Sequence, residues 1–207
     1  MHLLQTIVAT AKDMHATMRA SHAELVDTRR SLVEIKAELV ESRKLLGQDA
    51  LTGTYNRRAM DAILEREIAR ARRDAEPLVV AMVDIDHFKN INDTHGHAVG
   101  DAALVHLARV AKSMLRGNDA FIRYGGEEFL LVLPETALQG GMHVAGRLQA
   151  LLEKAPLVHE GKSIPMRFSA GVSALKDDDT EGLLLQRADG ALYKAKRAGR
   201  NRVVAGE

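Results

Sequence analysis

The chain has 207 residues, 46% of them apolar, and its 29 basic and 28 acidic side chains leave a net charge of +1. This length and apolar content suffice for one well-buried domain with an additional segment. The balanced charge provides no global field to attract nucleic acid or an anionic membrane, and the absence of cysteine excludes disulfides and thiol catalysis. Because no apolar run could cross a membrane and no signal peptide is recognisable, we predict a cytoplasmic protein without membrane insertion.

Residues 1–48 carry apolar side chains at alternating steps of three and four. Two such steps make a repeat of seven, as Leu25, Leu32 and Leu39 illustrate. No proline interrupts the stretch, and charged residues fill many of the intervening positions. A long exposed helix would leave such a stripe in water unless a second copy covered it, so we predict a parallel homodimeric coiled coil. A helix folded back onto its own domain is the alternative.

A second domain is predicted over residues 49–207, because Gly47 is well placed to end the helix. The domain begins with the sequence DALTGTYNRR, and an amphipathic helix is predicted over 59–73. The arginines of this helix alternate with glutamates and have no aromatic neighbours. This pattern favours a solvated face over a nucleic-acid surface.

A continuous apolar run over 78–83 predicts a buried strand that delivers Asp84, Ile85 and Asp86 to its end. Period-two geometry places Asp84 and Asp86 on one face. If Asp84 meets a glutamate from elsewhere, the two carboxylates need a hard divalent cation, to which Ile85 could add its carbonyl oxygen. Magnesium is the natural candidate, with manganese as a substitute; alternatively, the two aspartates simply end a strand.

The segment HFKNINDTHGHAVGD, residues 87–101, offers groups that suit a nucleotide. The ammonium of Lys89 could contact phosphate oxygens, and Asn92 and Asp101 have the donors and acceptors to bind a purine edge. The three histidines of this segment are spaced poorly for shared zinc ligation. A helix with an apolar stripe is predicted to follow over 102–115.

Arg116 and Asp119 form an Arg-x-x-Asp pair directly after this helix. The guanidinium of Arg116 could bind a phosphate or a guanine edge, and Asp119 could accept from a guanine. Arg147, on a later predicted helix, could support the same ligand. The alternative is an arginine at a helix C-terminus with a turn-forming aspartate.

Two β-rich apolar runs, AFIRY and FLLVLP, flank the sequence GGEE at residues 125–128, which predicts a hairpin with a two-residue turn. Gly125 and Gly126 could turn tightly and let a ligand approach the backbone. Because neighbouring side chains of a strand point to opposite faces, we expect Glu127 and Glu128 to have different roles, one of them facing a site. An ordinary hairpin with solvated glutamates is the alternative.

The C-terminal part of the chain is predicted to hold a cover helix over 144–152, a strand over 167–175 and a final amphipathic helix. The sequence DDDT, residues 177–180, is predicted to be a solvated turn that starts this helix. Lys196 and Arg200 lie four residues apart, so on one helical face they could hold a polyphosphate.

The motifs DIDHFKNIND, GHAVGD, RYGGEEF and ALYKAKRAGRNRV together resemble the GGDEF family of diguanylate cyclases from residue 49 to about residue 204. The resemblance implies an α+β domain with a ferredoxin-like nucleotidyl-cyclase palm, in which helices flank a mostly antiparallel central sheet, preceded by the long coiled-coil helix. DALTGTYNRR resembles the start of family domains, with Thr54 where leucine is usual.

The resemblance also implies the reaction, in which two GTP condense into cyclic di-GMP and release two pyrophosphates. It implies metal ligation by Asp84, Ile85 and Glu127, and catalytic roles for Glu127, Glu128 and Lys89. The implied substrate-binding residues are Asn92, His97, Asp101, Gly125, Gly126, Lys196 and Arg200. The implied product-inhibition site comprises Arg116 and Asp119, supported by Arg147.

Each domain would bind one GTP, so two domains must meet, and a homodimeric helix would raise their effective concentration. One alternative is a catalytically silent receptor for cyclic di-GMP, against which the intact Asp84, Lys89 and Glu127 argue. The other is a cyclase that also accepts ATP, against which Asp101 argues.

Overall fold

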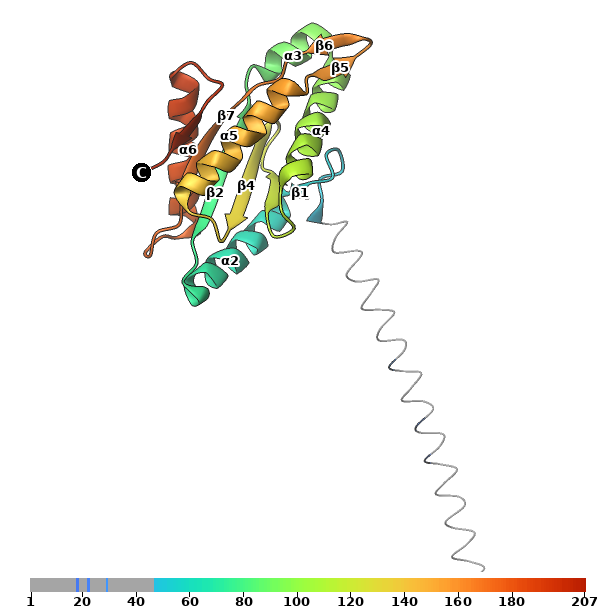
Figure 1. Ribbon diagram of the computed structural model, residues 1–207. Coiled ribbons are helices and arrows are strands. Elements are labelled where there is room, and N and C mark those ends of the chain that lie inside the picture. The colour runs from blue at the N-terminus through green and yellow to red at the C-terminus, as the bar shows by residue number, and fades with distance from the viewer. Residues whose placement is uncertain (1–17, 19–21, 23–28, 30–46) are drawn as a thin grey trace, which may run out of the picture. The chain divides into compact units, whose positions relative to one another are not determined.

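The computed structural model describes Met18, His22, Arg29 and residues 47–207. The chain divides into one unit of residues 1–46 and another of residues 47–207. The predicted helix over 1–48 therefore lies almost wholly outside the described residues, and its coiled-coil pairing remains a prediction. In the second unit, a mixed six-stranded sheet lies between helices (Figure 1).

The sheet has the strand order β1-β3-β4-β2-β7-β8. Its strands are β1 (Tyr55–Asn56), β2 (Leu78–Ile85), β3 (Ala120–Arg123), β4 (Glu128–Pro134), β7 (Phe168–Ala174) and β8 (Val203–Ala205). The three central pairings are antiparallel, and the two edge pairings, β1 with β3 and β7 with β8, are parallel. A separate antiparallel hairpin consists of β5 (Leu157–His159) and β6 (Lys162–Ile164).

Five helices accompany the strands in the described part of the second unit. They are α2 (Arg57–Asp74), α3 (Phe88–His95), α4 (His97–Met114), α5 (Leu138–Lys154) and α6 (Glu181–Arg197). Apart from the β5–β6 hairpin inserted before β7, the chain order from β2 to β7 is strand, helices, strand, strand, helix, strand, which is the ferredoxin-like βαββαβ order. The predicted sheet flanked by helices is confirmed. No described helix is long and apolar enough to cross a membrane.

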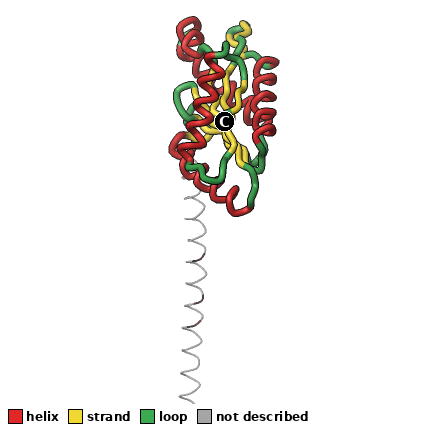
Figure 2. The backbone as a smooth tube through the Cα atoms, turned by 90° about the vertical axis from the view of Figure 1, so that its left-hand side faces the viewer, coloured by secondary structure: helices red, strands yellow, loops and turns green. Residues whose placement is uncertain are grey.

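The helices form one layer on each face of the sheet (Figure 2). Helices α3, α4 and α5 share one apolar cluster with the sheet, and α2 and α6 share the other. Strand β2 explains the division, because Val79 and Val83 join the first cluster whereas Val80 and Met82 join the second. Its side chains are buried on both faces, which accounts for the continuous apolar run in the sequence.

Candidate active site

Asp84 is the penultimate residue of β2, and its side chain lies on the face of the sheet that α6 covers. It follows Val80 and Met82 in period two and is only 5% exposed. Its Oδ2 is 2.7 Å from the Nζ of Lys196 on α6. Burial raises the pKa of Asp84, although the hydrogen bond and positive charge of Lys196 oppose that rise. This carboxylate is therefore buried and only partly neutralised.

The β3–β4 connection brings two glutamates to Asp84. Strand register pairs Asp84 with Glu128, and the Ile85 N–H donates to the Glu127 carbonyl at 3.3 Å. Burial raises the pKa of Glu127, and the negative charges of Asp84 and Glu128 raise it further. The expectation that strand alternation separates the two glutamates is wrong, because Glu127 lies in the turn, one residue before β4. Both glutamates are neighbours of Asp84.

The predicted two-residue turn is also wrong, because four residues, Tyr124 to Glu127, connect the strands. The N–H groups of Tyr124 and Gly125 both donate to the Glu128 carbonyl, at 2.8 and 3.1 Å. Neither glycine has positive φ. A Cβ at Gly125 would lie 2.7 Å from Glu128 Oε2 and would displace that carboxylate, whereas a Cβ on Gly126 would meet no atom within 4 Å. The open side of Gly126 leaves room for a ligand.

Arg123, for which the sequence pattern predicts no role, anchors this turn. Its guanidinium pairs with Asp49 at 3.1 Å and donates to the Gly126 carbonyl at 2.9 Å. Asp49 also accepts hydrogen bonds from the Thr52 backbone and hydroxyl. Burial opposes ionisation of Asp49, but the hydrogen bonds from Thr52 and Arg123 outweigh it and lower the pKa. The start of the domain is thereby fastened to the glycine turn.

The predicted phosphate contacts lie on three segments, and two of them, Lys196 and Arg200, act on Asp84. Lys89 is exposed in the first turn of α3, a helix whose first turn holds no acidic residue. Burial raises the pKa of Asp84, and the positive charges of Lys196 and Arg200 both oppose that rise, so both cations act on the same carboxylate. Their expected common helical face is wrong, however, because α6 ends at Arg197 and Arg200 adopts a φ of 62° beyond it.

The predicted purine contacts lie where α3 meets α4. Asn92 on α3 packs so closely against Gly100 that a Cβ on this glycine would lie 1.9 Å from the Asn92 Oδ1. Gly100 directly precedes Asp101, and His97 and Asp101 are exposed in the first two turns of α4. The glycine therefore permits the helix approach that brings Asn92 beside the start of α4.

The three residues of the predicted inhibitory site meet around a cavity of about 320 Å³. Asp119 accepts a hydrogen bond from the Arg116 N–H at 2.8 Å, and Arg147 on α5 donates to the Met114 carbonyl at 3.1 Å. Arg116 and Arg147 are both exposed, so their guanidinium groups are accessible to a ligand. The proximity of the three residues is compatible with the predicted site. Binding of a ligand there remains a prediction.

Within the described residues, no three His, Cys, Asp or Glu side chains converge as a ready metal cluster. The donors at the end of β2 nevertheless fit a hard cation, because Asp84 and Glu127 are carboxylates whose pKa values burial raises. Mutual repulsion adds to the rise for Glu127. A divalent cation would neutralise both groups, and the Ile85 carbonyl is an additional oxygen on the same strand end.

Comparison with known proteins agrees with the motifs. Residues 47–202 match the family model described as diguanylate cyclase, GGDEF domain. Diguanylate cyclase DgcP of Pseudomonas aeruginosa is 43% identical over 155 residues, 75% of this chain and 23% of that protein. The response regulator PleD of Caulobacter vibrioides is 40% identical over 166 residues, 79% of this chain and 37% of PleD. The chain thus spans well under half the length of these curated relatives.

Solved structures show the same likeness. Diguanylate cyclase SiaD of Pseudomonas aeruginosa, in complex with its activator SiaC, has a TM-score of 0.86 and 33% identity, covering 98% of this chain and 78% of that one. The coiled coil and GGDEF domain of DgcB from Caulobacter crescentus, in complex with c-di-GMP, has a TM-score of 0.79 and 30% identity, covering 89% and 98%. By its motifs, its fold and the match over residues 47–202, the chain belongs to the GGDEF family of diguanylate cyclase domains.

Proposed function

We propose that this chain condenses two GTP into cyclic di-GMP with release of two pyrophosphates. In each half-reaction a 3′-oxygen forms a bond to the α-phosphorus of the other GTP as the bond to pyrophosphate breaks. The observation that carries the proposal is the gathering of Asp84, Glu127 and Glu128 at one strand end, with the charges of Lys196 and Arg200 acting on Asp84. Carboxylates for a metal beside cations for phosphates are the groups that phosphoryl transfer requires.

The carboxylates divide into ligation and proton transfer. Asp84 and Glu127, with the Ile85 carbonyl, would hold magnesium or manganese, which supplies charge neutralisation and lowers the pKa of a bound hydroxyl. Glu127 would also accept the 3′-hydroxyl proton through a carboxylate oxygen. Glu128, paired with Asp84 in the register, supports the same end of the site.

Three cations would bind the triphosphate. The Nζ of Lys196 already lies 2.7 Å from Asp84, at the point where metal and phosphates would meet. Lys89 and the N–H groups at the start of α3 would contact phosphate oxygens, since a helix N-terminus favours anions. Arg200 adds a guanidinium, which suits phosphate geometry.

The guanine would lie at the α3–α4 junction. Asn92 on α3 and Asp101 on α4 offer the amide and carboxylate that a guanine edge requires, and His97 lies in the first turn of α4. Gly125 and Gly126 would let the nucleotide approach the backbone, and the open space at Gly126 supports this placement. Asp101 favours GTP over ATP, because a carboxylate accepts from the guanine N–H groups.

One domain holds half of the reacting atoms, so catalysis would require a homodimer. The heptad pattern of residues 1–48 would supply it by raising the effective concentration of the second domain. We further propose that cyclic di-GMP inhibits through Arg116, Asp119 and Arg147. The c-di-GMP complex of the DgcB domain supports binding of this ligand by the family.

The test is to incubate the purified chain with GTP and magnesium and identify the products by mass. We expect cyclic di-GMP and pyrophosphate, at least about 10²-fold less product from Glu127→Gln, and full activity from the exposed control Glu65→Gln. The Arg116→Ala variant should still form cyclic di-GMP at product concentrations that inhibit turnover by the wild type. If the wild type and Arg116→Ala, both freed of bound nucleotide, bind GTP without turnover, the proposed reaction is wrong.

A further inference from the structure

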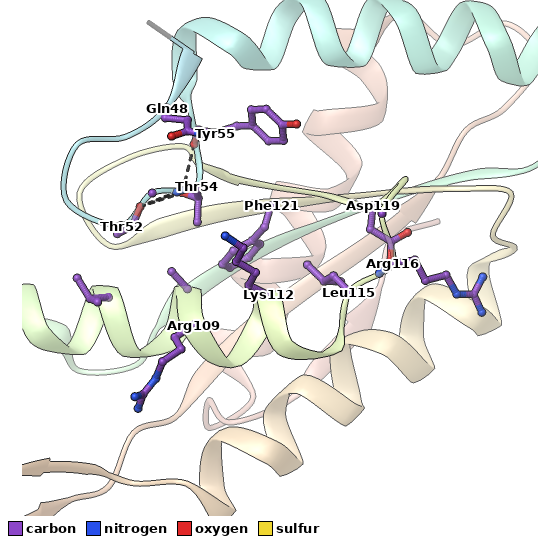
Figure 3. Close-up of a pocket in the computed structure, with 14 residues that line it drawn as sticks. Gln48, Thr52, Thr54, Tyr55, Arg109, Lys112, Leu115, Arg116, Asp119 and Phe121 are labelled. Carbon is purple, nitrogen blue, oxygen red and sulfur yellow. Dashed lines mark hydrogen bonds between the residues drawn. The ribbon is translucent and has the colours of Figure 1, made fainter. Parts of the chain in front are cut away.

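A second cavity, of about 630 Å³, lies between residues 48–55 and the side of α4 (Figure 3). We call residues 48–55 the connector and this cavity the connector groove. Leu115 and Phe121 line it, and Tyr55 and Val105 at its edge are 45% and 38% exposed. Its size and apolar lining are those of a small-molecule site rather than of a packing defect.

The lining of the groove carries three cations, Arg109, Lys112 and Arg116, and one carboxylate, Asp119. Lys112 extends from α4 toward the connector beside Phe121, whereas the side chain of Arg116 points away from both (Figure 3). Lys112 forms no ion pair with any residue that the structure describes. The one acidic residue of the lining, Asp119, already accepts from the Arg116 N–H. The lining therefore has more positive than negative charge, and the ammonium of Lys112 on the connector side complements an apolar anion.

Two contact paths join the groove to the catalytic turn. Thr52 lines the groove and donates to Asp49 at 2.7 Å. Asp49 pairs with Arg123, which donates to the Gly126 carbonyl. Independently, the Phe121 ring stacks on Phe129, with centroids 4.8 Å apart. Phe129 directly follows the two glutamates of the turn. Displacement of either wall would therefore be felt at the active site.

We propose that the connector groove is an effector site for a small aromatic anion. The aromatic body would cover Phe121 and Leu115, and the anionic group would pair with Lys112. Occupancy would fix Thr52 and thereby the Asp49–Arg123 clamp on the glycine turn. The groove shares Arg116 and Asp119 with the cavity at Arg147, but its connector wall and Lys112 are not part of that second cavity, which lies on the α5 side.

The binding test titrates the full chain with 8-anilinonaphthalene-1-sulfonate, an aromatic anion whose emission rises on leaving water. We expect saturable binding to one site per chain, weakened about tenfold by Lys112→Glu. Val105→Glu should weaken it similarly, and both positions are exposed enough to tolerate the change. Lys162→Glu, an equivalent charge reversal at exposed β6, should change nothing. Unsaturable binding, or equal affinity in Lys112→Glu, would overturn the proposal, as would displacement of the dye by cyclic di-GMP.

The transmission test follows the backbone amide signals of Gly125 and Gly126 by NMR as the dye is added. We expect both to shift in the wild type and in Thr52→Ser, which retains the hydroxyl. In Thr52→Val the Gly126 shift should fall at least about twofold while the dye still binds, because the hydroxyl bond to Asp49 is lost and only the backbone N–H bond remains. Dye binding without any shift at the turn would contradict an effector role.

The competing occupant is a second copy of the chain. Sedimentation of the wild type and Val105→Glu separates the two cases. Equal association of both proteins supports a free groove. If Val105→Glu dissociates a dimer and the dye binds only the monomer, the groove is an interface and the effector proposal is wrong.

Discussion

Two cations of helix α6 each pair with a buried aspartate outside the helix, and the two pairs differ in how many hydrogen bonds the carboxylate accepts. Near its start, Arg187 donates to both carboxylate oxygens of Asp179, which also accepts from the Lys176 N–H. Near its end, Lys196 makes a single 2.7 Å contact with Asp84. Both aspartates are less than a tenth exposed, so burial alone does not distinguish them.

The two pKa shifts have opposite directions. The hydrogen bonds from Arg187 lower the pKa of Asp179, whereas burial raises that of Asp84 despite Lys196. A planar guanidinium matches a carboxylate in two places, and an ammonium matches it in one. The first pair is therefore structural and leaves no unpaired charge. The second leaves a buried carboxylate able to bind a cation, as an active site requires.

The largest expected effect is on activity, from Asp84→Asn. Because this change removes a proposed metal ligand, cyclic di-GMP formation should fall about 10³-fold. The same substitution at Asp179 removes an equally buried charge but touches no substrate, so its activity should stay within about twofold of wild type while the protein is folded. The measurement is turnover at saturating GTP. Comparable losses in both variants would show that the comparison reflects folding alone.

Arg187→Ala should produce the largest loss of stability. It leaves Asp179 buried and unpaired, and breaking such a pair costs about 3 kcal/mol of unfolding free energy. Urea denaturation followed by circular dichroism measures the loss, and turnover of the folded fraction should not change. Arg202→Ala provides the control, because it removes an exposed arginine that forms no ion pair with any described residue. A loss under about 1 kcal/mol would refute the structural role.

The sequence was sufficient to place Asp84 but not to identify the anchor of its partner turn. Period two along a doubly buried strand sets the face of Asp84, and this holds because every residue of β2 is buried. Asp49 and Arg123 are 74 positions apart, and no local periodicity links them. Only the parallel β1–β3 pairing brings the connector to the turn.

Other differences arise where backbone geometry departs from regular elements. The prediction of a solvated DDDT turn is wrong for Asp179, which is buried against an arginine eight residues later. Thr180 does start α6, as its hydroxyl accepts from the Leu183 N–H. Gly199, with a φ of 109°, ends the helical path before Arg200. Such turns depend on tertiary partners that composition does not specify.

Lys196→Arg should make the second pair resemble the first. A forked donor would bind both oxygens of Asp84 and compete with a cation, so the magnesium concentration for half-maximal activity should rise about tenfold. The reverse exchange, Arg187→Lys, should lower unfolding free energy by about 1 kcal/mol without altering the magnesium requirement. Activity titrated with magnesium measures both variants. An unchanged requirement in Lys196→Arg would mean that incomplete pairing is not what keeps Asp84 available.

The smallest expected effect is a pH-dependent difference in stability. A carboxyl whose pKa is raised by folding contributes stability below its ordinary value and loses it as pH rises through the folded value. Glu127→Gln cannot ionise, so without metal it should be more stable than wild type at neutral pH, by less than about 1 kcal/mol because the site is partly exposed. The difference should vanish below 4.5, the ordinary pKa of a glutamate.

Asp179→Asn should show the opposite sign, being less stable at neutral pH and approaching wild type only below 3.8, the ordinary pKa of an aspartate. Urea denaturation across this pH range tests both, and a Glu127→Gln variant less stable at neutral pH would show that the glutamate is held by a partner rather than repelled by Asp84.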